Sequence, residues 1–290
     1  MGRRWPALEG RLRSAGLEFD SELTSHPGQA TELARRAVRA GRPVVGAVGG
    51  DGTISEVANG FFEGAEPIPT ASRLAVVSAG TGGDFRRTFG IPTEPERAAA
   101  MLRAGRSRRI DAGRVTCTLA GGETTIRYLV NVADAGIGQE VLARVNGGFR
   151  LLNGPVTYAV AAGLALLRWR NRPMRVCVDE EVCEAVAQQV VVANGQYFGG
   201  GLRIAPTALP DDGLLDVVLV GDVGMVDNLR GMQKIRRGTH LGHPKITHLR
   251  GRRIEISSPT PLHVDVDGEL PGMLPALVEV VPGALELVCP

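Results

Sequence analysis

A glycine-rich turn between an apolar run and a helix-like segment is the feature that most restricts the fold of this chain. Residues 44–60 read VVGAVGGDGTISEVANG. Strand–helix alternation of this kind favours a parallel sheet with helices on its faces. We therefore predict an α/β domain over residues 1–110. Its helices are expected at residues 5–15, 28–40, 54–62 and 95–104, and its strands at residues 17–23, 44–48 and 74–77.

The pattern changes near residue 110. Beyond it, short β-rich runs such as TTIRYLVNVADAG and GLLDVVLVG are separated by Gly, Asn, Asp and Pro. Short strands with frequent turns predict an antiparallel sandwich or barrel-like domain, which we place at residues 111–281. Two helical stretches are expected within it, at residues 148–170 and 225–237. We expect the last strand, residues 282–290, to return to the first domain.

The composition excludes several classes of protein. With 290 residues, of which 43% are hydrophobic, the chain can bury a substantial core. Its net charge of +2 argues against a dedicated nucleic-acid binder. The four cysteines lack C-x-x-C spacing, which favours buried thiols in a reducing compartment over a zinc site. No run of about 18 apolar residues and no signal peptide is recognisable. We therefore expect a cytoplasmic protein without a transmembrane segment.

The glycine turn has the composition of a phosphate site. Glycines leave the backbone accessible beside a helix N-terminus, where N–H groups attract anions. Asp51 does not suit a phosphate, so it would hold a cation, orient a donor or take part in proton transfer. The residues expected at this site are Gly49, Gly50, Asp51, Gly52, Thr53 and Ser55.

A second glycine loop, SAGTGGDF at residues 78–85, follows the strand predicted at residues 74–77. Neighbouring parallel strands end at the same edge, where open α/β sheets bind ligands. Neither loop matches the GxxxxGK[ST] or the GxGxxG pattern. The pair of loops favours a phosphate site, and a purely structural turn is the alternative.

Two acidic segments in the second half are candidates for chemistry. In LHVDVDGEL, Asp265 and Asp267 alternate along a strand and share a face, and Glu269 follows a glycine. A solvated edge or turn is the alternative. ALPDDGLLD contains Pro-Asp-Asp-Gly, which is by itself a good turn sequence. Carboxylate and carbonyl oxygens in such a turn also suit Mg²⁺ or Ca²⁺.

Positive charge concentrates at residues 231–253, GMQKIRRGTHLGHPKITHLRGRR. Most charge runs are solvated faces, but contact with anionic lipid headgroups is the functional alternative. RAGRSRR, at residues 103–109, is a second basic patch of the same kind.

The chain resembles the diacylglycerol kinase catalytic family, which includes soluble bacterial lipid kinases and sphingosine kinases. The GGDGT turn is shared with NAD kinases, whereas the DDGLLD run and the late DGE point to the lipid-kinase branch. The resemblance covers nearly the whole chain. It rests on five segments in the family's order: GGDGTISEVANG, SAGTGGDFRRTFGIP, NVADAGIGQEV, YFGGGLRIAPTALPDDGLLDVVLV and HVDVDGEL.

This resemblance implies an NAD kinase/diacylglycerol kinase-like α/β domain that binds ATP, a β-sandwich that contacts the lipid, and an active site between them. It implies that residues 49–55 hold the ATP phosphates, with Thr24 and Thr81 lining the nucleotide site on either side.

The resemblance also implies roles for the acidic residues. Glu269 is implied as the general base that takes a proton from the lipid hydroxyl, and Asp267 and Asp51 are the other candidates. A structural Mg²⁺ is implied at the acidic turn, in addition to Mg²⁺ on the nucleotide. Its ligands would be the Asp212 carboxylate and the carbonyl groups of Leu209 and Leu214.

Two departures from the family pattern are visible. The family opens with a strand that ends in an Asn-Pro…Gly turn, and MGRRWPALEG starts just after the expected position of that turn, so we expect the first strand to be lacking. Gly83 stands where the family's GTGND has asparagine.

The sequence thus predicts an ATP-dependent lipid kinase whose partner is a lipid substrate at the membrane surface. No nucleic-acid partner is expected, and a homodimer is an assembly to consider. The alternatives are an NAD kinase-like phosphotransferase and a non-catalytic lipid- or nucleotide-binding protein.

Overall fold

The computed structural model describes residues 4–80, 82–146, 160 and 163–290. Its first part is built on β1 (Val44–Gly49) and β4 (Arg73–Ser78), which lie parallel with Gly49 opposite Ser78. The glycine loops that follow these strands therefore leave from the same edge. The other elements here are α1 (Trp5–Ser14), α2 (Gln29–Arg39), α3 (Asp51–Asn59), β2 (Phe62–Glu63), β3 (Glu66–Pro67), α4 (Asp84–Phe89) and α5 (Pro95–Ala104).

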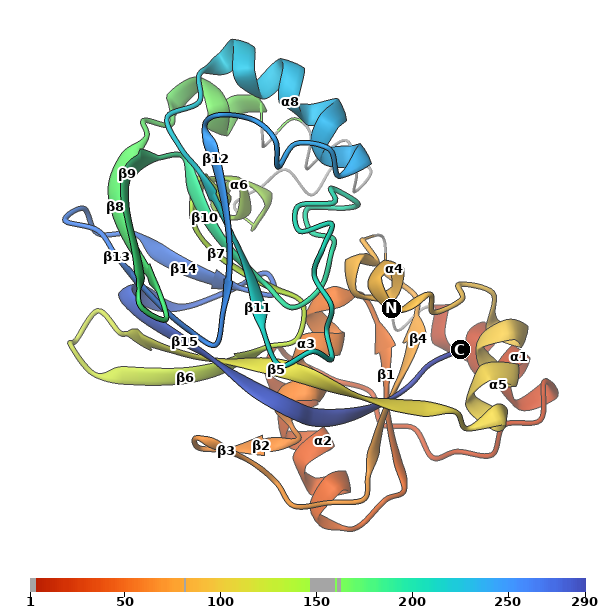
Figure 1. Cartoon of the computed structure of the whole chain (residues 1–290). Coiled ribbons are helices and arrows are strands. Elements are labelled where there is room, and N and C mark those ends of the chain that lie inside the picture. Colours follow the sequence, from red (N-terminus) through yellow and green to blue (C-terminus); the bar gives the residue numbers. More distant parts are fainter. Residues whose placement is uncertain (1–3, 81, 147–159, 161–162) are drawn as a thin grey trace.

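Helices cover both faces of this parallel pair (Figure 1). On one face, α2 and α3 place Val38 and Ile54 in the core. On the other, Trp5 of α1 and Ala99 of α5 form a smaller core with Val77. Both faces need a cover because both carry apolar side chains, as is usual for parallel strands.

The rest of the chain is a curled antiparallel sheet that closes into a sandwich (Figure 1). Its strands follow the order β12-β11-β10-β7-β14-β15-β13-β8-β9. Val176, Val217 and Val264 come from different parts of this sheet and meet in one core. The strands and helices are β5 (Ser107–Thr118), β6 (Thr124–Leu129), β7 (Val132–Gly136), α6 (Ile137–Asn146), β8 (Arg172–Val178), β9 (Glu181–Ala187), β10 (Gln189–Ala193), β11 (Leu215–Val220), α8 (Met225–Arg237), β12 (Ile246–Gly251), β13 (Arg253–Ser257), β14 (His263–Val266) and β15 (Glu269–Val288).

β5 and β15 run through both halves of the molecule. They pair antiparallel from Met273 opposite Thr118 to Val288 opposite Ser107. Near its end, β15 also lies parallel to β4. The same two strands therefore contribute to the α/β layer and to the sandwich.

The predicted fold class is confirmed, with one error among its strands. The helix expected at residues 54–62 begins earlier, at Asp51, inside the GGDGT turn. The strand expected at residues 17–23 is wrong, because these residues form no ladder with any described strand and Leu23 is 61% exposed. Most of the helix expected at residues 148–170 lies outside the described residues. Among the described residues, no helix is long and apolar enough to cross a membrane.

Candidate functional site

The two glycine loops meet at the carboxyl edge of the parallel pair. The Gly49 carbonyl accepts hydrogen bonds from the N–H groups of Ala79 (2.8 Å) and Gly80 (3.1 Å). A side chain at Gly80 would collide with the backbone of Gly50, and a Cβ at Gly49 would come within 2.5 Å of the Thr53 hydroxyl oxygen. Glycine at 80 thus lets the two loops pack backbone against backbone, and glycine at 49 leaves room for the side chain of Thr53.

Gly52 is a glycine for a different reason. It lies in the first turn of α3, whose N-cap is Gly50. The first N–H groups of a helix have no partner within it and attract anions. Gly52 is exposed, and no atom lies within 4 Å of the position that its Cβ would take. Packing does not require glycine here, so the missing side chain leaves the helix N-terminus open to a ligand.

Asp51 joins the two loops. Its carboxylate accepts hydrogen bonds from the N–H groups of Gly83 (2.7 Å) and Phe85 (3.1 Å), at the start of α4. A Cβ on Gly82 would come within 2.6 Å of Asp51 Oδ2. Of the roles considered for Asp51, this geometry supports an orienting one, in which it holds the second loop against the first.

Asp267 lies in the turn between β14 and β15. Its carboxylate accepts hydrogen bonds from the N–H groups of Val130 (2.9 Å), Asn131 (3.1 Å) and Val132 (2.8 Å). Burial, with a smaller contribution from the negative charge of Asp51, raises the pKa of Asp267 to about 6. The glycine turn and the DGE turn, which lie far apart in the sequence, are therefore close enough to interact electrostatically.

Asn59 ties the end of α3 to the strand that leads to this turn. Its side chain accepts a hydrogen bond from the Tyr128 N–H and donates one to the Tyr128 carbonyl, each 2.9 Å long. Tyr128 belongs to β6, just before the backbone that binds Asp267. One helix thus begins at the glycine turn and ends against the support of Asp267.

Glu269 is the first residue of β15 and pairs with Arg127 at 2.5 Å. Burial is the largest cause that raises the pKa of Glu269, and the negative charge of Glu56 in α3 adds to this rise. The positive charge of Arg127 acts in the opposite direction and lowers the pKa. The Glu269 side chain is 36% exposed. In the described part of the chain it accepts no backbone hydrogen bond, so one carboxylate oxygen stays available.

The remaining residues expected at the nucleotide site lie in different surroundings. Ser55 is fully buried, and its hydroxyl has no hydrogen-bond partner among the described residues, so it faces the core rather than the open turn. Thr24 lies in an exposed segment ahead of α2, without a hydrogen bond to the glycine turn among the described residues. Thr81 lies outside the described residues.

Two buried carboxylates were not singled out in the sequence. Asp84 accepts a hydrogen bond from Gly200 N–H (2.8 Å), and Asp111 accepts bonds from Gly213 and Gly283 N–H (both 2.7 Å). Burial is the main cause that raises the pKa of both carboxylates. The signal that marks them is an acidic residue directly after a glycine loop or inside an apolar strand.

The acidic turn is not arranged as a metal cage. One carboxylate oxygen of Asp212 accepts the N–H of Leu214 (3.0 Å), and the other pairs with Arg250. Leu209 is half exposed. Among the described residues, no group of three or more His, Cys, Asp or Glu side chains could hold a metal ion. In this arrangement Arg250 supplies the positive charge beside Asp212, and the Mg²⁺ expected at Leu209, Asp212 and Leu214 stays a prediction.

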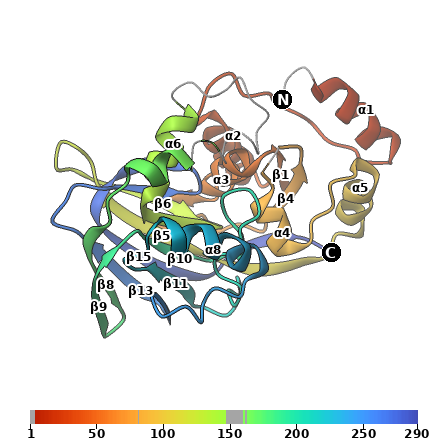
Figure 2. The same ribbon diagram turned by 90° about the horizontal axis from the view of Figure 1, so that it is seen from above.

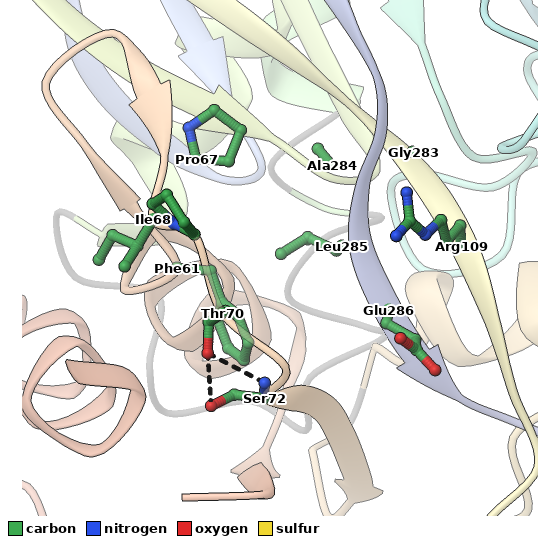
Figure 3. Close-up of a pocket in the computed structure, with 11 residues that line it drawn as sticks. Phe61, Pro67, Ile68, Thr70, Ser72, Arg109, Gly283, Ala284, Leu285 and Glu286 are labelled. Atoms are coloured by element: carbon green, nitrogen blue, oxygen red, sulfur yellow. Dashed lines mark hydrogen bonds between the residues drawn. The ribbon is translucent and has the colours of Figure 1, made fainter. Parts of the chain in front are cut away.

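A pocket lies at the opposite edge of the parallel pair (Figure 3). Pro67, Thr70 and Ser72, which lead into β4, line it together with Arg109 and Leu285. Ligands of open α/β sheets bind at the carboxyl ends of the strands. This pocket is at the amino end of β4 and is therefore separate from the candidate site.

Comparison with known proteins agrees with this architecture. Residues 1–115 match the diacylglycerol kinase catalytic domain, and residues 131–289 match the YegS C-terminal NAD kinase beta sandwich-like domain. The chain is 30% identical to a Stenotrophomonas maltophilia (strain K279a) protein named "Probable lipid kinase YegS-like", over 97% of this chain and 90% of that protein. The chain belongs to the diacylglycerol kinase catalytic family.

Other members of the diacylglycerol kinase family extend the likeness over the same length. A protein named "Diacylglycerol kinase" from Staphylococcus aureus (strain bovine RF122 / ET3-1) is 30% identical, over 94% of this chain and 83% of its own. The crystal structure of a diacylglycerol kinase from Bacillus anthracis str. Sterne superposes with a TM-score of 0.69. That pair is 23% identical over 97% of this chain and 88% of the other, which shows a shared fold.

Proposed function

We propose that the protein is an ATP-dependent lipid kinase that transfers the γ-phosphoryl group to a hydroxyl group of diacylglycerol or a related lipid. Relatives named diacylglycerol kinase over most of the chain support this activity. The observation that carries it is the open N-terminus of α3 at Gly52, with Asp267 and Glu269 of the other half nearby.

Phosphoryl transfer needs positioned phosphates, neutralised charge and one base at the attacking hydroxyl. In the proposed mechanism, the N–H groups of the first turn of α3 hold the phosphates. Asp51 keeps the second glycine loop in place through Gly83 and Phe85. Asn59 keeps α3 in register with the strand that supports Asp267.

Mg²⁺ is proposed to arrive with the nucleotide. The Asp51 charge raises the pKa of both Asp84 and Asp267, so these carboxylates lie near enough to Asp51 to interact electrostatically. Mg²⁺ is usually held by one or two carboxylates together with substrate phosphates rather than by a protein cage. Because Asp51 and Asp267 are already engaged by backbone N–H groups, the nucleotide phosphates would supply most of the ligands, and the ion would neutralise phosphate charge.

Glu269 is the proposed general base. Asp267 is committed to three backbone N–H groups, which suits a positioning role. One carboxylate oxygen of Glu269 makes no hydrogen bond within the described part of the chain, and burial already raises the pKa of this group towards the range useful for proton transfer. Arg127 fixes the direction of its side chain.

The lipid substrate implies action at a membrane surface, so we propose a cytoplasmic enzyme in peripheral contact with the membrane. The acidic turn, with Leu209, Asp212 and Leu214, is proposed to serve the fold through Arg250 rather than through a bound ion. For the assembly state we propose a homodimer, which a measurement of molecular mass in solution would test.

The test is transfer of label from ATP, with Mg²⁺, to a mixed lipid extract and, separately, to NAD. We expect a labelled lipid, and Glu269→Gln should lower kcat by about 10²- to 10⁴-fold, the usual contribution of a general base. Glu279→Gln is a matched control, because Glu279 also lies on β15 and pairs with Arg114 and Arg253. It should keep wild-type kcat. Transfer to NAD alone would establish the NAD kinase alternative, and ATP binding without transfer would establish the non-catalytic one.

A further inference from the structure

α8 has an unusual exposure for a helix of a folded protein. None of its thirteen residues is buried. Val226 is 57% exposed and Leu229 is 71% exposed, and both lie on its outward face. Ile235 packs from the opposite side of the helix against the core. Only a narrow stripe of side chains therefore packs α8 against the core. The outward apolar side chains make no contribution to this packing.

The cations of α8 lie on this outward side. On a helical wheel at 3.6 residues per turn, Arg237 and Arg230 lie about 20° and about 40° to the same side of Val226, and Arg236 lies about 20° from Leu229. In the described part of the chain none of these three arginines pairs with a carboxylate. The single acid of the helix, Asp227, is already paired with Lys245 at 2.8 Å. The net charge of this face is thus positive and uncompensated.

The structure divides the basic run at residues 231–253 into two parts. Lys245, Arg250 and Arg253 are engaged by carboxylates of the protein, and His240 is buried. Among the described residues of this run, Lys234, Arg236 and Arg237 of α8 and the exposed Arg252 between β12 and β13 make no ion pair with a carboxylate. Three of these four cations therefore share α8 with the exposed Val226 and Leu229.

A second apolar site adjoins α8. Residues 163–168 are helical and carry Leu167, which is 71% exposed. Asn171, just after them, donates hydrogen bonds to Asp222 Oδ1 (2.7 Å) and to the Val223 carbonyl (3.1 Å), just before α8. Figures 1 and 2 show this segment beside the start of α8. The two most exposed leucines among the described residues are thus on neighbouring helices.

We propose that this surface, defined by Leu167, Val226, Leu229, Arg230, Arg236 and Arg237, docks the enzyme on an anionic lipid bilayer. Apolar side chains rimmed by arginine suit the boundary between acyl chains and headgroups. Each cation near an anionic leaflet adds about 1 kcal/mol, which is about a fivefold change in partition. A second copy of the chain is disfavoured as occupant, because two such faces would bring unpaired arginines together. The inference deepens the proposed function, on which it rests only for the choice of a lipid surface as partner.

The experiment is co-sedimentation with vesicles of phosphatidylcholine alone or of phosphatidylcholine with phosphatidylglycerol, without ATP. We expect binding to the anionic vesicles only, weakened by salt because the charges are exposed. Leu229→Gln should lower the partition coefficient about tenfold, and the double variant Arg236→Gln/Arg237→Gln about 30-fold.

Matched controls separate this surface from general hydrophobicity and charge. Leu23→Gln removes another exposed leucine, which is 61% exposed, and Arg97→Gln/Arg103→Gln removes two exposed cations from α5. Both controls should bind like the wild type. Equal binding to both vesicle types, or wild-type binding by the α8 variants, would overturn the proposal. Concentration-dependent dimerisation that Leu229→Gln abolishes, without any vesicle binding, would assign the surface to a second copy instead.

A kinase assay keeps the two proposals apart. On a short-chain lipid dispersed below its micelle concentration, Leu229→Gln should keep wild-type kcat, whereas on anionic vesicles its rate should fall with its binding. If no variant transfers phosphate, the proposed function fails while the sedimentation result still decides the docking surface.

Discussion

Gly52 and Gly80 both belong to the glycine loops, but only one of them is explained by packing. A Cβ at Gly80 would collide with the Gly50 backbone, whereas a Cβ at Gly52 would meet open space. We expect Gly80→Ala to lower the free energy of unfolding by about 2 kcal/mol through overpacking. Gly52→Ala should leave stability unchanged or raise it slightly, because alanine favours the helix, while ATP affinity falls at least about tenfold.

Urea unfolding and ATP titration measure these two effects separately. Gly10→Ala in α1 is the control, since Gly10 is also exposed with no atom near its Cβ position. Gly10→Ala should leave ATP affinity unchanged, and it should change the free energy of unfolding by no more than about 1 kcal/mol. If the Gly52→Ala protein binds ATP like the wild type, the proposal that the phosphates bind at the N-terminus of α3 is wrong.

Asp134 and Asp265 form a buried acid pair, directly opposite each other on β7 and β14. Burial raises the pKa of Asp134 to about 7, and burial together with the Asp134 charge raises that of Asp265. Each folded pKa lies above the unfolded value of about 3.9, so the stabilisation is complete below that value and is lost as pH rises towards about 7. Asp134→Asn should therefore flatten the pH dependence of unfolding and raise stability at about pH 8 by on the order of 2 kcal/mol.

Urea unfolding at about pH 5 and about pH 8 tests this sign. The exposed Asp20, which pairs with Arg42 at the surface, offers a control in Asp20→Asn, whose curve should follow the wild type. If Asp134→Asn is less stable than the wild type at the higher pH, ionisation of this buried pair is not what lowers the stability of the protein.

At the scale of elements, the local sequence pattern correctly predicted features that depend on neighbouring residues in the chain. The strand–glycine–helix order was enough to bring the loops after β1 and β4 to one edge. Residues 17–23 show the limit, because their alternation matches a strand but no described strand lies beside them to bond. The contacts of Asp111 with Gly213 and Gly283 could not be read from the sequence, since they join segments that only the tertiary fold brings together.

At the acidic turn before β11, either Arg250 or a Mg²⁺ ion can compensate the charge of Asp212, and we propose Arg250. Arg250 of β12 pairs with Asp212 and, at 3.2 Å, with Asp216, whose side chain is 1% exposed. We expect a chelator to leave the melting temperature of the wild type unchanged. Arg250→Gln should cost about 2 kcal/mol, because it leaves the buried Asp216 with only His248 and Thr207 as side-chain partners, and added Mg²⁺ should restore part of that loss.

Thermal melts with and without Mg²⁺ measure this effect. Arg253→Gln is the control, because Arg253 also pairs with two carboxylates but is half exposed. It should change stability by less than about 1 kcal/mol and show no response to Mg²⁺. If a chelator destabilises the wild-type protein, that result supports a resident Mg²⁺ at Leu209, Asp212 and Leu214.

At the scale of the whole molecule, the two halves share their longest strands. Leu285 and Leu287 of β15 belong to the core of the α/β half, whereas Ala276 and Val278 of the same strand belong to the core of the sandwich. β5 is divided in the same way along its length. Unfolding one half would therefore strip paired strands from the other. We expect a single cooperative transition, although chains of two domains often unfold in steps.

The two tryptophans of the chain report on the two halves. Trp5 is buried in the small core under α1, and Trp169 packs against the sandwich core. In the single-tryptophan variants Trp5→Phe and Trp169→Phe, fluorescence should give the same urea midpoint as circular dichroism measured on the same protein. Separate midpoints within either variant would mean that β5 and β15 can fray at the boundary. The glycine turn and the DGE turn would then separate without global unfolding, and substrate entry by such a separation would become the mechanism to test.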